Sequence, residues 1–134
     1  MKTTIRVAIL ATALLGFSCI GAAQESKQTN TASAPKPITY DLLKSALDAP
    51  GENPLVLDVR TKLEFDQGHI PGAVLMPYDS IQADFKEADK SRPIVVYCRS
   101  GNRSSIAART LAGMGYTDVT DFGAVSKWRG KLQD

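Results

Sequence analysis

One cysteine ends an apolar run and opens a loop of small, polar and cationic residues, and this loop is the stretch best suited to chemistry. The loop that follows Cys98 consists of Arg99, Ser100, Gly101, Asn102, Arg103 and Ser104. Gly101 can adopt the positive φ that turns successive backbone N–H groups inward as an anion-binding nest. Arg99 and Arg103 add two full positive charges beside the sulfur. Because these groups favour thiolate over thiol, the sequence predicts a nucleophilic cysteine in an anion-binding loop.

The alternative is that Cys98 is a small buried hydrophobe, which is the usual role of a cysteine at a strand end. The following residues argue against it, because few of the sequence neighbours of the sulfur are apolar. The only other cysteine, Cys19, falls in the amino-terminal segment discussed below. A processed chain would therefore hold one thiol and no internal disulfide, which agrees with a thiol kept for reaction.

Alternating strands and helices are expected to position this loop. Residues 94–97 have the β-branched and aromatic composition of a strand buried on both faces, and apolar residues recur at helical spacing from Ile106 to Met114. The loop is thus a turn between a strand and a helix, whose N-terminus faces the sulfur. The fold class is α/β, with a mostly parallel central sheet flanked by helices on both faces. In such sheets ligands bind beyond the carboxyl ends of the strands, where Cys98 is expected.

The other expected elements follow the same alternation. Their strands cover residues 55–59, 74–76 and 117–120. The first expected helix is capped by Thr39 and has an apolar stripe of Leu42, Leu43, Ala46 and Leu47. A short helix with capping-box spacing is expected at residues 61–64. Two further helices are expected at residues 80–86 and at 124–131, the last anchored by Trp128.

The first residues have the pattern of a secretory signal peptide. Lys2 and Arg6 precede an apolar stretch at residues 7–17, and small residues at 21–23 form a cleavage site. The apolar stretch is too short to span a membrane as a stable helix. Cys19 raises the alternative of a lipoprotein signal, but Phe17 is bulky where such signals have a small residue. We expect residues 1–23 to be removed, which predicts a periplasmic protein with no membrane association after cleavage.

A polar tether and one folded domain are expected after the signal peptide. Residues 24–37 have no apolar periodicity and predict a flexible linker, and residues 38–134 are long enough for one domain. Cleavage would reduce the 16 basic side chains to 14, equal to the 14 acidic ones. Nucleic acid is therefore not an expected partner.

Several short motifs, taken in their order along the chain, resemble the rhodanese family, specifically a single-domain exported sulfurtransferase. They are Leu57-Asp58-Val59-Arg60, Glu64-Phe65, residues 68–73 (GHIPGA), residues 96–104 (VYCRSGNRS), and Gly115-Tyr116 with the later Trp128. The resemblance covers roughly residues 38–132. One departure is Gly123-Ala124, where the family often has two adjacent glycines, so one wall of the pocket can differ.

The resemblance implies that Cys98 accepts a sulfane sulfur as a persulfide and passes it to a thiol or to cyanide. The amides of residues 99–103 would stabilise the thiolate and then the persulfide, and the two arginines would attract an anionic donor such as thiosulfate or a polysulfide. A protein thiol is a further possible acceptor. No metal or organic cofactor is implied, because the cysteine itself carries the sulfur.

Asp58, Arg60 and His69 are the other candidates, and a structural role is favoured for each. Asp58 is expected to bind backbone groups at the end of its strand, and Arg60 to pair with Glu64. His69 could act as a base, but it lies in a turn, and in the family the equivalent residue belongs to the scaffold. A metal site lacks ligands, since the acids are scattered and there is one histidine.

Two other functions remain open at this level. A related branch of the same fold contains cysteine phosphatases, but the loop from Cys98 to Arg103 is one residue shorter than theirs. A binding or sensing module without catalysis is the second, although such modules commonly lose the cysteine. A redox role like that of thioredoxin is disfavoured, because its paired cysteines are absent.

Overall fold

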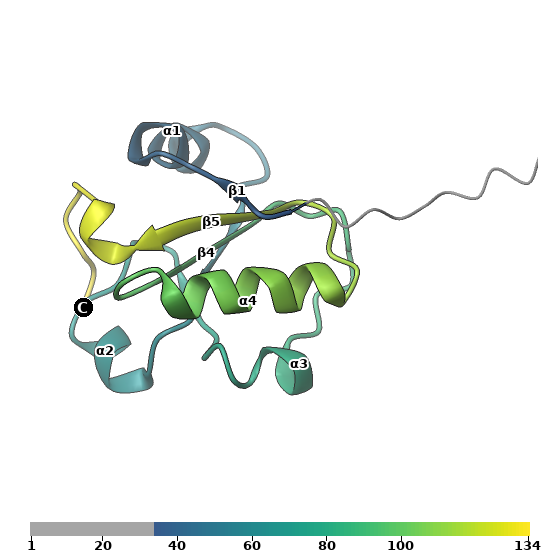
Figure 1. The fold of residues 1–134 in the computed structure, drawn as a ribbon. Coiled ribbons are helices and arrows are strands. Elements are labelled where there is room, and N and C mark those ends of the chain that lie inside the picture. Colours follow the sequence, from purple (N-terminus) through teal and green to yellow (C-terminus); the bar gives the residue numbers. More distant parts are fainter. Residues whose placement is uncertain (1–33) are drawn as a thin grey trace, which may run out of the picture.

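The structure is a computed structural model that describes residues 34–134, which form one five-stranded sheet with helices on both faces (Figure 1). The predicted signal peptide, residues 1–23, and the predicted linker up to residue 33 lie outside the described residues. The strands are β1 (Lys36–Pro37), β2 (Leu55–Asp58), β3 (Val74–Leu75), β4 (Ile94–Cys98) and β5 (Val119–Ala124). The helices are α1 (Tyr40–Asp48), α2 (Lys62–Asp66), α3 (Ile81–Asp84) and α4 (Asn102–Gly113), and η1 (Val125–Lys127) is a 3-10 turn.

The strand order is β1-β5-β4-β2-β3, and every pair is parallel. The expected α/β class with a parallel central sheet is therefore confirmed. The sheet begins two residues before the expected start of the domain at residue 38, because Lys36 and Pro37 pair with Thr120 and Asp121 of β5. A proline is compatible with that position because β1 is an edge strand.

Strand β4 lies at the centre of the sheet, and all five of its residues are buried. Side chains alternate along a strand, so Ile94, Val96 and Cys98 enter one core and Val95 and Tyr97 the other. Helices α3 and α4 cover the core that contains Cys98, and α1 covers the opposite face (Figure 1). Each fully buried aliphatic side chain contributes about 1.5–3 kcal/mol, so burial on both faces stabilises β4 in the sheet.

The helix starts follow the predicted caps. The Thr39 hydroxyl accepts from the Leu42 amide at 3.4 Å, and Thr61 with Glu64 forms a complete capping box. The apolar stripe of α1 is narrower than expected, because Leu42 is 62% exposed while Leu43 is fully buried. The two side chains point about 100° apart around the helix, so both cannot face the sheet.

The predicted helix at residues 124–131 is wrong. β5 runs to Ala124, six residues in place of the short strand expected at 117–120, and only the 3-10 turn η1 follows. Trp128 has extended backbone angles, and its ring packs edge-on against Tyr40 of α1 with centroids 5.1 Å apart. This contact holds Trp128 against α1, and the chain after η1 therefore does not continue as a helix.

Candidate active site

The candidate site forms at the edge of the sheet where β2 and β4 end. Asp58 pairs in register with Tyr97, so the carboxyl end of β2 lies beside the residue that precedes Cys98. The loop after Cys98 turns at once into α4, whose N-terminus faces back toward the end of β4. The predicted turn between a strand and a helix is therefore present, with the cysteine at its first position.

Backbone groups of the loop surround the Cys98 sulfur. The Gly101 amide donates to Sγ at 3.0 Å, and Gly101 itself has φ of 102°, the left-handed conformation expected of it. The Ser104 hydroxyl donates to the Gly101 carbonyl at 2.9 Å, and the Ser105 amide donates to the same oxygen at 3.0 Å. These contacts fix the loop so that its N–H groups stay directed at the sulfur.

The surroundings of Cys98 affect its pKa in opposite directions. Its side chain is fully buried, and burial by itself raises the thiol pKa because it disfavours the charged form. Hydrogen bonds from the backbone N–H groups of Ser104, Gly101 and Ser100, with the Ser104 hydroxyl, oppose that effect. Together they hold the pKa of Cys98 below its ordinary value. The site can therefore stabilise a negative charge on sulfur without a metal or a basic side chain in contact with it.

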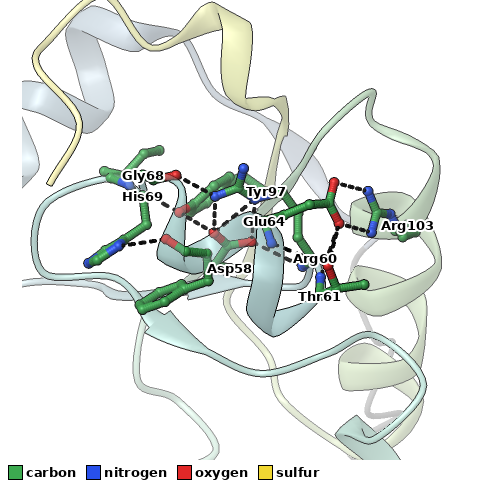
Figure 2. Close-up of polar contacts among 10 residues, drawn as sticks. Asp58, Arg60, Thr61, Glu64, Gly68, His69, Tyr97 and Arg103 are labelled. Carbon is green, nitrogen blue, oxygen red and sulfur yellow. Dashed lines mark hydrogen bonds and ion pairs between the residues drawn. The ribbon is translucent and has the colours of Figure 1, made fainter. Parts of the chain in front are cut away.

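Arg103 faces α2, where Glu64 binds it. Its two terminal nitrogens donate to the two Glu64 oxygens at 2.7 and 2.8 Å, a bidentate pair between α2 and the first turn of α4 (Figure 2). The Arg103 guanidinium and the Thr61 cap lower the pKa of Glu64 to about 2. The positive charge of Arg103 is thus balanced by a carboxylate that the sequence analysis had assigned to a different arginine.

The expected pairing of Arg60 with Glu64 is wrong, because Arg60 pairs with Asp58. Its Nη2 lies 2.6 Å from Asp58 Oδ2 and donates to the Gly68 carbonyl at 2.7 Å, while its amide donates to Asp58 Oδ1 at 3.0 Å (Figure 2). Both side chains of the pair are buried. The expected backbone contact of Asp58 is present, but its main partner is a guanidinium two residues away that closes the turn after β2.

Tyr97 connects this buried pair to the strand that carries the cysteine. Its hydroxyl donates to Asp58 Oδ2 at 2.7 Å and accepts from the Ile70 amide at 3.1 Å. Burial, with the Asp58 hydrogen bond, raises the pKa of Tyr97 well above its ordinary value, so it stays a neutral donor. Tyr97 is not among the candidate residues that the sequence singles out. The feature of the sequence that could have indicated Tyr97 is its position directly before Cys98, which directs its side chain to the face of the sheet opposite to the sulfur.

His69 belongs to the scaffold. Its ring stacks on Phe65 with centroids 3.7 Å apart, Nδ1 lies 3.1 Å from the Phe65 carbonyl, and its backbone forms a bridge with Gln133. The histidine therefore attaches the C-terminal residues to the segment after α2.

On the other side of the loop, β5 ends in a backbone that suits the Gly123-Ala124 pair. Gly123 has φ of 85°, whereas Ala124 has φ of −81° and ψ of 136°, angles that any residue adopts. A glycine is needed at the first position only, so the alanine does not disturb the wall. A Cβ on Gly101 would lie 3.8 Å from the Gly123 Cα, and a Cβ on Gly123 would lie 3.0 Å from Lys127 Nζ. Lys127 thus lies over Gly123, next to the loop.

Apart from Arg103, which is bound to Glu64, the predicted site residues divide into three groups. Cys98, Gly101 and Ser104 form one group, linked by hydrogen bonds through Gly101. Asp58 and Arg60 form a second group, which is connected to Cys98 through the neighbouring residue Tyr97. The side chains of Arg99, Ser100 and Asn102 are exposed at the rim. In residues 34–134, no cluster of three His, Cys, Asp or Glu side chains could hold a metal ion, and none of the helices has the length and apolar content of a membrane span.

Known proteins resemble this chain over much of the described domain. The family model Rhodanese-like domain matches residues 39–131. Thiosulfate sulfurtransferase GlpE of Pseudomonas syringae is 40% identical over 76 residues, which are 56% of this chain and 72% of that protein. The YrkF protein of Bacillus subtilis is 32% identical over 110 residues, 81% of this chain, but the chain spans only 58% of YrkF. The UBA4 protein of Meyerozyma guilliermondii is 40% identical, and the chain spans 20% of it.

Solved structures agree with the fold. The Alr3790 protein of Anabaena superposes with a TM-score of 0.66 and 29% identity, covering 72% of this chain and 81% of that one. The human single-domain sulfurtransferase TSTD1 superposes with a TM-score of 0.63 at 24% identity, covering 71% and 95%, and supports the fold alone. With a cysteine loop at the carboxyl end of a parallel sheet and a family match across nearly all of the described residues, the chain belongs to the rhodanese family.

Proposed function

We propose that this protein is a thiosulfate-type sulfurtransferase that carries sulfane sulfur as a persulfide on Cys98. The observation that carries the proposal is the buried thiol with a lowered pKa, held 3.0 Å from the Gly101 amide at the end of β4. A relative named as a thiosulfate sulfurtransferase, 40% identical over 76 residues, supports the same reaction.

The chemistry has two steps, each a displacement at sulfur. In the first, the Cys98 thiolate attacks the sulfane sulfur of thiosulfate; a Cys–S bond forms, the S–S bond of thiosulfate breaks, and sulfite leaves with the electron pair. In the second, a thiolate or cyanide attacks the outer sulfur of the Cys98 persulfide. The persulfide bond breaks, the Cys98 thiolate is restored, and an organic persulfide or thiocyanate leaves.

The loop stabilises the anionic sulfur in both forms. The inward N–H groups that lower the thiol pKa face the thiolate before the first step and the persulfide after it. In this proposal Arg99, Ser100 and Asn102 contact the donor at the exposed rim of the loop. Gly101 and Ser104 shape the cradle, Arg103 is held beside it by its side-chain bond to Glu64, and Asp58 and Arg60 support it through Tyr97.

Intact mass measures the proposed cycle directly. Purified protein incubated with thiosulfate should gain the mass of one sulfur atom and lose it again on addition of a thiol or cyanide. Cys98→Ser should show no gain, and its sulfur-transfer rate should fall by about a thousandfold or more, as for the loss of a catalytic nucleophile. A wild-type protein that gains no sulfur from thiosulfate, polysulfide or a persulfide would contradict the proposal.

A parallel assay with a phosphate monoester tests the phosphatase alternative, and faster hydrolysis than sulfur transfer would favour it. A partner-binding phenotype that survives Cys98→Ser would favour a binding module.

We also propose that the protein is exported with removal of residues 1–23. The composition of this segment supports the proposal, with two basic residues before an apolar stretch and small residues before Gln24. Protein recovered from the periplasm of an expressing bacterium should have the intact mass of residues 24–134. A chain that retains Met1 and stays in the cytoplasm would contradict export without affecting the proposed reaction.

A further inference from the structure

A hollow of about 280 Å³ lies beside the active-site loop, between α4 and the end of β5. Its walls are formed by Pro35, Pro37, Ser105, Arg109, Asp121, Gly123 and Lys127. Two of these residues adjoin the cradle of the sulfur. Gly123 packs against Gly101, whose amide donates to Cys98 Sγ, and the Ser105 amide donates to the Gly101 carbonyl. The hollow is therefore separated from the reacting sulfur by the thickness of the loop at Gly101.

The charges in this hollow are unbalanced. Arg109 donates to the Ser105 hydroxyl at 2.8 Å, and within residues 34–134 neither Arg109 nor Lys127 forms an ion pair. Asp121 is the one acid in the walls, and its Oδ1 accepts from the Gly123 amide at 2.8 Å. Two cations beside one carboxylate leave a net positive charge, in contrast to the neutralised arginine on the other side of the loop.

We propose that this hollow is a subsite for the carboxylate of an organic thiol or persulfide whose sulfur reacts at Cys98. The inference rests on the proposed sulfurtransferase function and specifies its substrate class. Thiosulfate carries its charge one bond from the transferred sulfur, so its sulfonate stays at the mouth of the cradle. A group that reaches Lys127 must be attached to the sulfur through a linker that passes Gly101. An acidic thiol is the class of acceptor that the two cations would favour, and a neutral thiol of the same size gains nothing from them.

The kinetic test compares thiol acceptors of different charge on protein loaded with sulfur from thiosulfate and freed of excess donor. The acceptors are 3-mercaptopropionate, neutral 2-mercaptoethanol and cationic cysteamine, and loss of the sulfur atom is followed by rapid-quench intact mass. For each acceptor the rate of the variant is divided by that of the wild type, which cancels the intrinsic reactivity of the thiol. Lys127→Gln and Arg109→Gln are tested beside Lys86→Gln, which removes an equal charge from the exposed residue that follows Phe85.

Lys127→Gln should lower the rate with 3-mercaptopropionate about two- to fivefold, the size of one exposed charge interaction, and the double variant should lower it further. The rates with 2-mercaptoethanol should stay within about 1.5-fold in every variant, since a neutral thiol has no ionic contact to lose. Lys86→Gln should leave all three acceptors equal to wild type. Equal losses for the acidic and the neutral thiol, or an equal loss in Lys86→Gln, would overturn the subsite.

A binding measurement separates failure of the subsite from failure of the proposed function. The Cys98→Ser protein, which cannot transfer sulfur, is titrated with 3-(methylthio)propionate while amide NMR shifts are followed. The amides of Gly123 and Ser105 should shift and saturate, and Lys127→Gln in the same background should weaken the response. Shifts equal to those caused by neutral 2-(methylthio)ethanol would overturn the proposal even if the persulfide cycle is found; saturable shifts without any persulfide would uphold the subsite and reject the reaction.

Discussion

The two flanks of the active-site loop differ in how their charges are treated. On the α2 flank every charge has a partner: Arg103 binds Glu64 with both terminal nitrogens, and Asp58 binds Arg60 in a buried pair extended by Tyr97. On the β5 flank Arg109 and Lys127 face a hollow with a single carboxylate, and neither forms an ion pair in the described part of the chain. Paired charges fix the positions of the segments that carry them, whereas unpaired charges at a hollow are available to bind a ligand.

Two arginines of the loop that look alike in the sequence differ in whether their charge is paired. Arg99 and Arg103 flank the same glycine-containing turn, yet Arg103 is tied to α2 while Arg99 is exposed at the rim. A positive charge already bound to a carboxylate offers little net attraction to a distant anion. The α2 flank is therefore expected to determine loop geometry and stability, and the rim with the β5 flank to determine which anions are preferred.

The largest expected effect is on stability, at the buried pair of the α2 flank. Asp58→Asn should lower the free energy of unfolding by about 3 kcal/mol or more, because Arg60 would remain buried without its counter-ion. Asp66→Asn makes the same chemical change in the exposed pair with Lys62 and should cost less than about 1 kcal/mol. Urea denaturation measures both. Equal losses in the two variants would remove the contrast between buried and exposed pairs.

The next effect concerns the Glu64 and Arg103 pair, which should act as one unit in catalysis. Arg103→Gln and Glu64→Gln should each reduce kcat/KM for thiosulfate about tenfold, and the double variant should be little worse than either, a coupling on the order of 1–2 kcal/mol. Steady-state assays of the four proteins measure it. If Arg103 bound the donor directly, Glu64→Gln would release its charge and lower KM instead, so the direction of that one change decides between the two roles.

A smaller effect is expected in the pH dependence of sulfur uptake. Since hydrogen bonds hold the Cys98 pKa below its ordinary value, the rate of persulfide formation should reach half of its plateau at a pH below that ordinary value and fall as pH decreases through that midpoint. Ser104→Ala removes one of the contributing groups and should move the midpoint upward. Thr110→Val, which changes a hydroxyl bonded to the Ile106 carbonyl, should not move it. A downward shift in Ser104→Ala would contradict the hydrogen-bond explanation.

The smallest effect is the pH dependence of stability due to Glu64. Its pKa is about 2 in the folded protein against an ordinary value of 4.5, so its contribution is complete above about pH 5 and is lost as pH falls toward 2. The thermal midpoint of Glu64→Gln should therefore lie below that of the wild type at pH 6 and approach it only as the pH falls toward 2. A difference that stays constant over this range would show that the carboxylate charge is not what stabilises the flank.

Local chemistry in the sequence was sufficient for the elements that begin with a cap or fill the centre of the sheet. Thr39, the capping box of Thr61 and Glu64, and the β-branched run before Cys98 all predict what the structure contains, because each pattern acts over a few neighbouring residues. The helix predicted for the C-terminal segment is wrong for the opposite reason. Its backbone is determined by the packing of Trp128 on Tyr40, a contact between residues 88 positions apart in the chain that no local pattern encodes.

By itself the sequence determined the parallel α/β class, the place of Cys98 at the end of a central strand and the need for glycine at residue 101, since these follow from periodicity, burial and backbone sterics. Only the tertiary structure decided the partners of the charges. Arg60 pairs with Asp58 and not with Glu64, and Glu64 pairs with Arg103 of α4. Lys127 lies over Gly123. Electrostatic attraction acts through space between any opposite charges, so its outcome depends on the distances that folding sets.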